Sequence, residues 1–479
     1  MVFSNTLLAG SAAQGDSVYK IDQSIRFNSA DSPYMSRTPS STGNRKTFTS
    51  SCWVKLGDLT NCALPMPTVA QTASYGMYLA SGIIQVFIYY TGSAWQGQLY
   101  TNRVFRDPSA WFHLVTVVDT TQAISSERVR FYVNGQRETS FSTENYPNQN
   151  QDTDWNNSGE AMGIGVNANG FSGSFGEYYA AEMHYLDGLA YGPEFFGETN
   201  DNGIWVPKEY TGSYGTNGFY IKGADASALG TDSSGNGNNF TTSGLAAHDQ
   251  MADSPSNNHA VMNILDTRTT ANWTASNGNL DVYWQGNSYP NPLFSTLSMP
   301  ATGKWYFEIE FDTDGSGNVL TNQNMRIGLM REDINAAYVE ANASTDLTTS
   351  STSPEIIVVL GNAGNSCQLK GMGSNIYNVG GSISAGDRIN FAREGANLWI
   401  GKNGTYYNSG NPATGSNPTL SNLQLEGYRA NMQWSTGNTS ANCIVKAYFG
   451  ADKSIGSGTG FNDTVPSGFL ALNTTNLGS

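Results

Sequence analysis

Three carboxylates alternate along one short stretch of the chain. Glu308, Glu310 and Asp312 stand at every second position, and residues two apart in an extended strand share one face. Retaining glycoside hydrolases use two carboxyl groups about 5–5.5 Å apart, one as nucleophile and one as acid. The alternative is a half-buried strand with an ordinary acidic solvent side. We favour this second interpretation and predict no catalytic residue and no enzymatic activity.

Three aromatic residues stand in turn-like surroundings that suit sugar binding. Trp95, Trp155 and Tyr214 are each flanked by Gly, Ser, Asn or Asp residues. An aromatic ring can stack on the apolar face of a pyranose while nearby amides bond its hydroxyl groups. We therefore predict these three residues as ligand contacts. For each of them the alternative is that the ring packs beneath its own loop.

No metal site and no cofactor site is predicted. The four histidines stand outside any H-E-x-x-H pattern, and no G-x-S-x-G motif or phosphate-binding glycine loop occurs. We expect His113 to lie in the core, and His248 and His259 to be solvated. Turn-rich strings after Asp232 and Asp312 space oxygen ligands as calcium loops do, but both lack the closing glutamate. Turns rich in Asn and Asp explain both strings, and a lone calcium site stays an open alternative.

The charge balance excludes some classes of partner. The chain of 479 residues carries 24 basic and 39 acidic side chains, a formal net charge of −15, without a run of Lys or Arg. Nucleic acid binding depends on clustered cations, so we expect no nucleic acid partner. No apolar stretch approaches the roughly 20 residues of a membrane helix, so no membrane insertion is expected. Four cysteines favour reduced, buried thiols, although a Cys52–Cys62 bridge stays possible.

The elements that must position these residues are strands. Charged residues make up only 13% of the chain, and glycines number 53, a composition that disfavours long helices. Residues 83–90 form an apolar run that predicts a buried strand, and residues 111–119 are apolar on both faces, as a central strand of a sandwich is. Residues 47–55 predict a strand with Phe48, Cys52 and Val54 on one side and Trp53 on the other, and residues 305–312 alternate in the same way. Asn134-Gly135 and Asn403-Gly404 predict type I′ hairpin turns. We predict an all-β protein whose sheets pack as sandwiches.

The composition along the chain suggests boundaries for these domains. Residues 1–20 show no regular spacing of apolar residues and are predicted to be a docking arm. Residues 21–230 and 261–479 each carry strand patterns and are predicted to be the two sandwiches. Residues 231–260 are rich in Ser, Asn and Gly, which predicts a surface connection between them.

Several strings resemble known families. The stretch WFHLVTVVD followed by VRFYVNG resembles laminin-G-like and concanavalin A-like lectin/glucanase domains, and the matching residues are Trp111, His113, Tyr132, Val133, Asn134 and Gly135. The strings AEMHYLDGLAYGPEFFGETN and LGTDSSGNGNNFT resemble virion proteins of tailed phages, many of them marine. The strings GKWYFEIEF, MRIGLM and NLWIGKNGTYYN are similar to SPRY domains. These resemblances imply two tandem antiparallel β-sandwich domains of jelly-roll type, a concanavalin A-like one followed by a SPRY-like one.

The resemblance to phage proteins implies a role. We expect a structural virion protein, a tail fibre or appendage subunit that helps attach the phage to a host-surface glycan or receptor. It would lie on the virion surface after assembly in the host cytoplasm, and residues 1–20 would dock to other virion proteins. A homo-oligomer is expected, with a trimer favoured. The alternatives are a capsid or tail decoration or scaffold protein without a receptor, and a glycan depolymerase.

Overall fold

The chain divides into two compact units, which are described separately. The computed structural model describes residues 19–69, 76–90, 92, 94–167, 173–266, 273–284, 292–312, 324–335, 355–359, 368–371, 374–378, 383–435 and 443–478. The N-terminal unit holds the described residues up to Asn258 together with Ser276–Gly278, and the C-terminal unit holds the others. Both are built from antiparallel sheets, which confirms the predicted all-β fold. Among the residues described, no helix is long and apolar enough to cross a membrane.

The largest sheet of the N-terminal unit has three long central strands, β9 (Phe112–Asp119), β3 (Thr47–Leu56) and β16 (Tyr178–Asp187), paired in that order. The sheet is completed by β11 (Gln136–Arg137), β10 (Val129–Val133), β1 (Ser24–Phe27), β21 (Gln250–Met251) and β19 (Phe219–Ile221). Phe48, Cys52 and Val54 of β3 face the hydrophobic core, while Trp53 lies on the other face and stacks on His113. The sequence predicts this alternation correctly, because successive side chains of a strand point to opposite faces.

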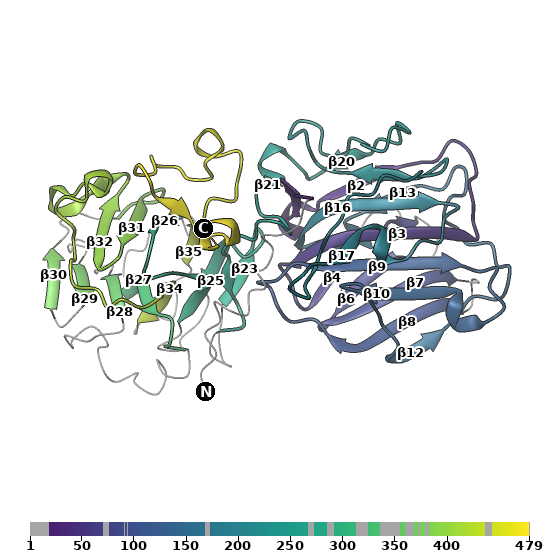
Figure 1. Cartoon of the computed structure of the whole chain (residues 1–479), viewed down its shortest axis with the longest axis horizontal. Helices are drawn as coiled ribbons and strands as arrows, with labels where there is room; N and C mark the ends of the chain where they lie inside the picture. Colours follow the sequence, from purple (N-terminus) through teal and green to yellow (C-terminus); the bar gives the residue numbers. More distant parts are fainter. Residues whose placement is uncertain are drawn as a thin grey trace. The chain divides into compact units, whose positions relative to one another are not determined.

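The second sheet of this unit has five strands (Figure 1). Their order is β12 (Phe141–Asn145), β8 (Trp95–Val104), β7 (Ile83–Tyr90), β6 (Gly76–Ala80) and β4 (Asn61–Ala63). Smaller sheets join β20 (Thr241–Ser243), β2 (Tyr34–Arg37), β13 (Met162–Ile164) and β5 (Thr68–Val69), then β14 (Val166–Asn167) and β15 (Ser174–Phe175), then β17 (Gly197–Thr199) and β18 (Trp205–Pro207). Inward side chains of both large sheets, such as Val54 and Val86, share one hydrophobic cluster, as in a β-sandwich.

Residues 231–258 belong to the N-terminal unit. Their strands β20 and β21 pair with β2 and β1. Asp249 forms a buried ion pair with Arg26, and Asp253 forms one with Lys55. This placement differs from the surface connection that the sequence predicts for residues 231–260. Composition reveals the turns of the segment, but it does not show that two of its carboxylates meet buried cations.

The C-terminal unit contains two further large sheets (Figure 1). One joins β22 (Met262–Asn263), β25 (Leu293–Met299), β34 (Tyr428–Ser435), β27 (Asn324–Arg331), β28 (Glu355–Val359), β29 (Gln368–Gly371) and β30 (Ser374–Asn378). The other joins β23 (Trp273–Ser276), β24 (Asp281–Trp284), β35 (Cys443–Tyr448), β26 (Lys304–Phe311), β31 (Arg388–Glu394), β32 (Asn397–Lys402) and β33 (Thr405–Tyr406), with β36 (Leu470–Ala471) parallel to β26.

The described helices are short. They are η3 (Ser29–Asp31), η4 (Ser125–Glu127), η6 (Pro193–Phe195), η7 (Ala247–Asp249), η8 (Tyr407–Ser409), η9 (Pro412–Thr414), η10 (Gly456–Gly458) and the α-helix α2 (Thr474–Leu477). Both predicted hairpin turns are confirmed, with positive φ at Asn134 (47°), Gly135 (76°), Asn403 (50°) and Gly404 (77°). At Gly135 a side chain is also excluded by space, since a Cβ atom there would lie 2.5 Å from the Trp205 ring.

Candidate binding face

The outer side of the five-stranded sheet carries half-buried aromatic and amide side chains. Along β7, Ile84, Val86 and Ile88 face the core, whereas Gln85 and Phe87 between them are half-buried on the opposite side. The same alternation continues on the neighbouring strands. We call this surface the aromatic–amide face; it consists of Tyr78, Gln85, Phe87, Gln98, Tyr100, Thr143 and Asn145.

The strand register arranges this face in rows. Tyr78, Gln85, Tyr100 and Thr143 are partners on four successive strands. Because neighbouring strands lie about 4.8 Å apart, this row spans roughly 14 Å. In the adjacent row Phe87 pairs with Gln98 and Gln98 with Asn145. The rows place rings beside amides, which is the combination that a sugar ring with its hydroxyl groups requires.

Contacts within the face hold the side chains in place. The Gln98 amide nitrogen lies 2.6 Å from the Tyr100 hydroxyl oxygen and donates to it. The Phe87 ring meets the Tyr100 ring edge-on, with centroids 5.6 Å apart. Burial raises the pKa of Tyr100, so its phenol stays neutral at physiological pH. All seven side chains of the face are uncharged at neutral pH, which favours a neutral, hydroxyl-rich ligand over an ionic one.

Trp95 lies beside this face, whereas the other two predicted contacts do not. Trp95 is half-buried at the start of β8, and its ring centroid lies 4.8 Å from that of Phe87. Trp155 is fully buried and stacks on Phe48 in the core. Tyr214 is 8% exposed, and its hydroxyl lies 2.9 Å from Nδ1 of His184. For Trp155 and Tyr214 the structure therefore corrects the prediction of ligand contact, because both rings pack inside the unit.

Tyr214 belongs to a buried polar cluster on the outer side of β16. Glu182 lies in a β-bulge with a φ of 52°, and its carboxylate accepts hydrogen bonds from the hydroxyls of Tyr19 and Tyr220. Nε2 of His184 lies 3.4 Å from the same carboxylate. These contacts lower the pKa of Glu182 against the opposing effect of burial. Because the groups satisfy one another below the surface, the cluster ties segments of the chain together.

The other histidines divide between core and surface. His113 is fully buried between Ser51 and Trp205, as predicted, and burial together with the nearby His184 lowers its pKa to about 3. His248 is exposed. The prediction for His259 is wrong, because this residue is 2% exposed and its Nδ1 lies 3.1 Å from the Phe449 carbonyl oxygen. A β-bridge pairs His259 with Asn473, so His259 packs against the C-terminal segment.

The alternating carboxylates of β26 serve different local roles. Glu308 is fully buried and accepts hydrogen bonds from the backbone amides of Asn462 and Asp463, each at 3.0 Å. Burial raises the pKa of Glu308. Glu310 instead lies 3.6 Å from Arg388 in an ion pair. Glu308 thus fastens the segment before β36, while its neighbour is balanced by a cation.

Two questions that the sequence leaves open are the nature of the turn-rich strings after Asp232 and Asp312 and the state of the cysteines. The Asp232 carboxylate accepts hydrogen bonds from the backbone amides of Tyr220, Ser234 and Asn238, as the interpretation of a turn rich in Asn and Asp expects. The string after Asp312 lies outside the described residues. Cys52 and Cys62 are both buried free thiols, so no bridge joins them.

The sequence contains a signal for the aromatic–amide face, but the prediction missed it. The sequence predicts a buried strand at residues 83–90, where the structure shows only one side of β7 in the core. Gln85 interrupts the apolar run at the position that pairs with Tyr78 and Tyr100. A polar residue inside such a run is the sign that one face of the strand meets solvent.

Residues 29–179 match the family model of the concanavalin A-like lectin/glucanases superfamily. The matched region contains all five strands of the sheet that carries the aromatic–amide face. No curated protein matches the chain.

Solved structures similar to the chain have low sequence identity. The SPRY domain of human HERC1 is 14% identical, with 39% of this chain and 96% of that chain covered and a TM-score of 0.27. Domains LG4-5 of the mouse laminin alpha1 chain are 9% identical over 90% of each chain, with a TM-score of 0.30. A putative carbohydrate binding protein from Bacteroides ovatus is 12% identical over 47% of this chain and 58% of that chain, with a TM-score of 0.32.

Proposed function

We propose that this chain is a non-catalytic glycan-binding protein and that the aromatic–amide face is its binding site. The observation that carries the proposal is the uncharged array of rings and amides on a sheet that lies wholly within the lectin/glucanase match. The ring of Phe87 would stack on a sugar, and the amides of Gln85 and Gln98 would bond its hydroxyl groups. The buried Glu308 and the ion-paired Glu310 argue against a catalytic carboxylate pair.

The biological setting is part of the proposal. The chain would be a tail fibre or appendage subunit on the virion surface of a tailed phage, assembled in the host cytoplasm, that attaches the particle to host glycans. This rests on the phage-like strings of the sequence. Residues 1–20, of which the first eighteen lie outside the described residues, would dock to other virion proteins. Trimerisation would raise the avidity of a shallow site by about 10²–10⁴ through linked copies.

Glycan binding by the purified chain tests the site. We expect binding to one or more neutral oligosaccharides on a glycan array. Phe87→Ala should lower the affinity about fivefold, since an aromatic contact contributes roughly 1 kcal/mol. Tyr132→Ala is the matched control, because Tyr132 is also half-buried but lies on β10 of the other sheet.

Three outcomes would count against the proposal. Equal losses for Phe87→Ala and Tyr132→Ala would refute the assignment of the face. No binding on the array and no adsorption to host cells, together with defective particles when the gene is deleted, would favour a decoration or scaffold protein. Release of reducing ends from a host polysaccharide, abolished by Glu308→Gln or Glu310→Gln, would indicate a depolymerase.

A further inference from the structure

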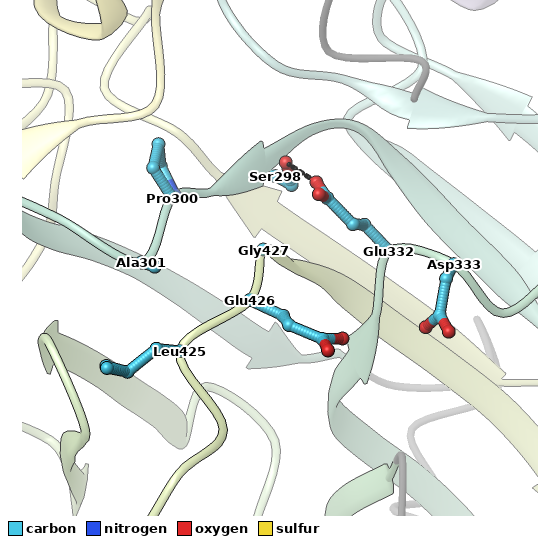
Figure 2. A pocket seen from close by; sticks show the side chains of 8 residues that line it. All are labelled: Ser298, Pro300, Ala301, Glu332, Asp333, Leu425, Glu426 and Gly427. Carbon is cyan, nitrogen blue, oxygen red and sulfur yellow. Dashed lines mark hydrogen bonds between the residues drawn. The ribbon is translucent and has the colours of Figure 1, made fainter. Parts of the chain in front are cut away.

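The C-terminal unit has a pocket that the aromatic–amide face does not involve. Its volume is about 450 Å³, within the range of small-ligand sites. It lies where three segments meet: the end of β25, the turn after β27 and the residues before β34 (Figure 2). Its lining consists of Ser298, Pro300, Ala301, Glu332, Asp333, Leu425, Glu426 and Gly427.

The lining combines apolar surface with negative charge. Pro300, Ala301 and Leu425 supply the apolar part, and Leu425 is 69% exposed. Glu332, Asp333 and Glu426 supply three carboxylates, and Arg331 neutralises part of this charge by pairing with Asp333 and Glu426. The three carboxylates and the Arg331 guanidinium sum to −2, and the buried Arg393, whose charge interacts with Glu332, brings the formal charge at the pocket to −1. A cationic occupant that also has an apolar portion matches this lining.

Hydrogen bonds of a buried arginine and of the backbone connect the three segments. Arg393 is fully buried and donates to the carbonyl oxygens of Met299 at 2.8 Å and Gln424 at 3.2 Å. A backbone hydrogen bond of 2.9 Å from the Glu332 amide to the Gly427 carbonyl joins the remaining segment, the turn after β27, to the residues before β34. These contacts hold the walls of the pocket in place, so binding would require little ordering of the chain.

The carboxylates favour an ammonium group over a guanidinium group. Both oxygens of Asp333 accept from Arg331, at 2.6 and 2.7 Å. One oxygen of Glu332 accepts from the Ser298 hydroxyl at 2.7 Å (Figure 2). One oxygen of Glu426 lies 3.1 Å from Nε of Arg331. None of the three therefore presents both oxygens, which the planar fork of arginine needs for a bidentate pair. The ammonium of lysine is a point charge on an aliphatic stem, and it needs only single oxygens.

We propose that this pocket binds the side chain of a lysine exposed on a partner protein. The stem of the lysine lies along Leu425 and Pro300, and its ammonium group meets the carboxylates of Glu332 and Glu426. The C-terminal unit is then a second, protein-directed binding module of the chain.

Fluorescence anisotropy with the full chain tests the proposal. The probe is a labelled, end-capped peptide with one lysine between leucine and glycine residues, and the comparison peptide carries acetyl-lysine. We expect the acetyl-lysine peptide to bind on the order of tenfold more weakly, as a charge-assisted hydrogen bond is lost. Binding of the lysine peptide should weaken with added salt, because the pocket is open to solvent.

Two variants of the chain locate the site. Glu332→Gln removes one charge and keeps the shape of the side chain. Gly427→Ala displaces the Glu332 carboxylate, because a Cβ atom at Gly427 would lie 2.1 Å from that carboxylate. Both should weaken the lysine peptide severalfold. Asp452→Asn is the control, since Asp452 bonds to Ser454 in its own turn and does not line the pocket.

The proposal fails if the lysine and acetyl-lysine peptides bind equally. It also fails if Asp452→Asn weakens binding as much as Glu332→Gln and Gly427→Ala do. Binding of free glucosamine without binding of the lysine peptide would overturn it too, since the occupant would then be an amino sugar. Circular dichroism confirms that each variant is folded, and two independent pocket variants keep the test decisive if one of them does not fold.

Discussion

The buried ion pair of Lys55 and Asp253 should dominate the stability of the N-terminal unit. Their side chains are 1% and 0% exposed, and Nζ lies 2.7 Å from the Asp253 carboxylate. Nζ also lies 2.8 Å from the side-chain oxygen of Asn258, and the indole of Trp111 donates to Asp253 at 2.8 Å. Lys55→Met keeps the length of the side chain but removes the charge that compensates a buried carboxylate. Removing one partner of such a pair costs about 3–5 kcal/mol.

Urea denaturation measures this cost. With a slope of roughly 1–3 kcal/mol per molar urea, the midpoint should fall by about 1–5 M. Hydrogen exchange should accelerate at residues 246–258, because Lys55 links β3 to this segment. The double variant Lys55→Met/Asp253→Leu should recover much of the loss, since replacing both charges by apolar side chains is often neutral. A midpoint shift below about 0.3 M, or a double variant less stable than Lys55→Met, would refute the reasoning.

Two further predictions concern pH. The pKa of His113 is lowered to about 3 by burial, so between pH 6.5 and 3 the unfolded chain binds a proton that the folded chain does not. The free energy of unfolding should therefore fall as the pH drops through this window, and the fall should be smaller in His113→Gln. If the free energy of unfolding depended equally on pH in both proteins, the burial of a neutral imidazole would be contradicted. Burial raises the pKa of Glu308 above its ordinary 4.5, so its contribution to stability should be present below pH 4.5 and lost as the pH rises through the folded pKa. Equilibrium unfolding of Glu308→Gln from pH 4 to 7 should lack this fall, and an unchanged profile would show that the carboxyl titrates normally.

Strand positions and turn types were predictable because they depend on local pattern. The run at residues 83–90 coincides with β7, and both Asn-Gly pairs form the expected turns. The prediction missed the solvent face of β7 although Gln85 marks it, and periodicity within one strand does not show which side chains of other strands share that face. Tyr78, Gln85 and Tyr100 come together only through the pairing of β6, β7 and β8.

Ligand contacts were predicted from the turn residues that flank each aromatic ring, and for two of the three rings this criterion gave the wrong answer. Trp155 has the same flanking turns as an exposed sugar platform, yet its ring is 0% exposed against Phe48. Turn residues report the path of the backbone, whereas burial of a ring depends on what packs over it. The pocket of the C-terminal unit shows the same limit, because Ser298, Glu332 and Glu426 are far apart along the chain.

By itself, the amino-acid sequence determined that this chain forms sheets, where its tight hairpins turn and how little charge its surface carries. These properties arise from alternation, glycine and asparagine geometry and composition, all of which act between near neighbours. Only the tertiary structure decided which aspartates meet Lys55 and Arg26, which rings face solvent, and where carboxylates converge on a pocket. Those outcomes depend on contacts between distant segments, and in these contacts burial and charge compensation outweigh local preference.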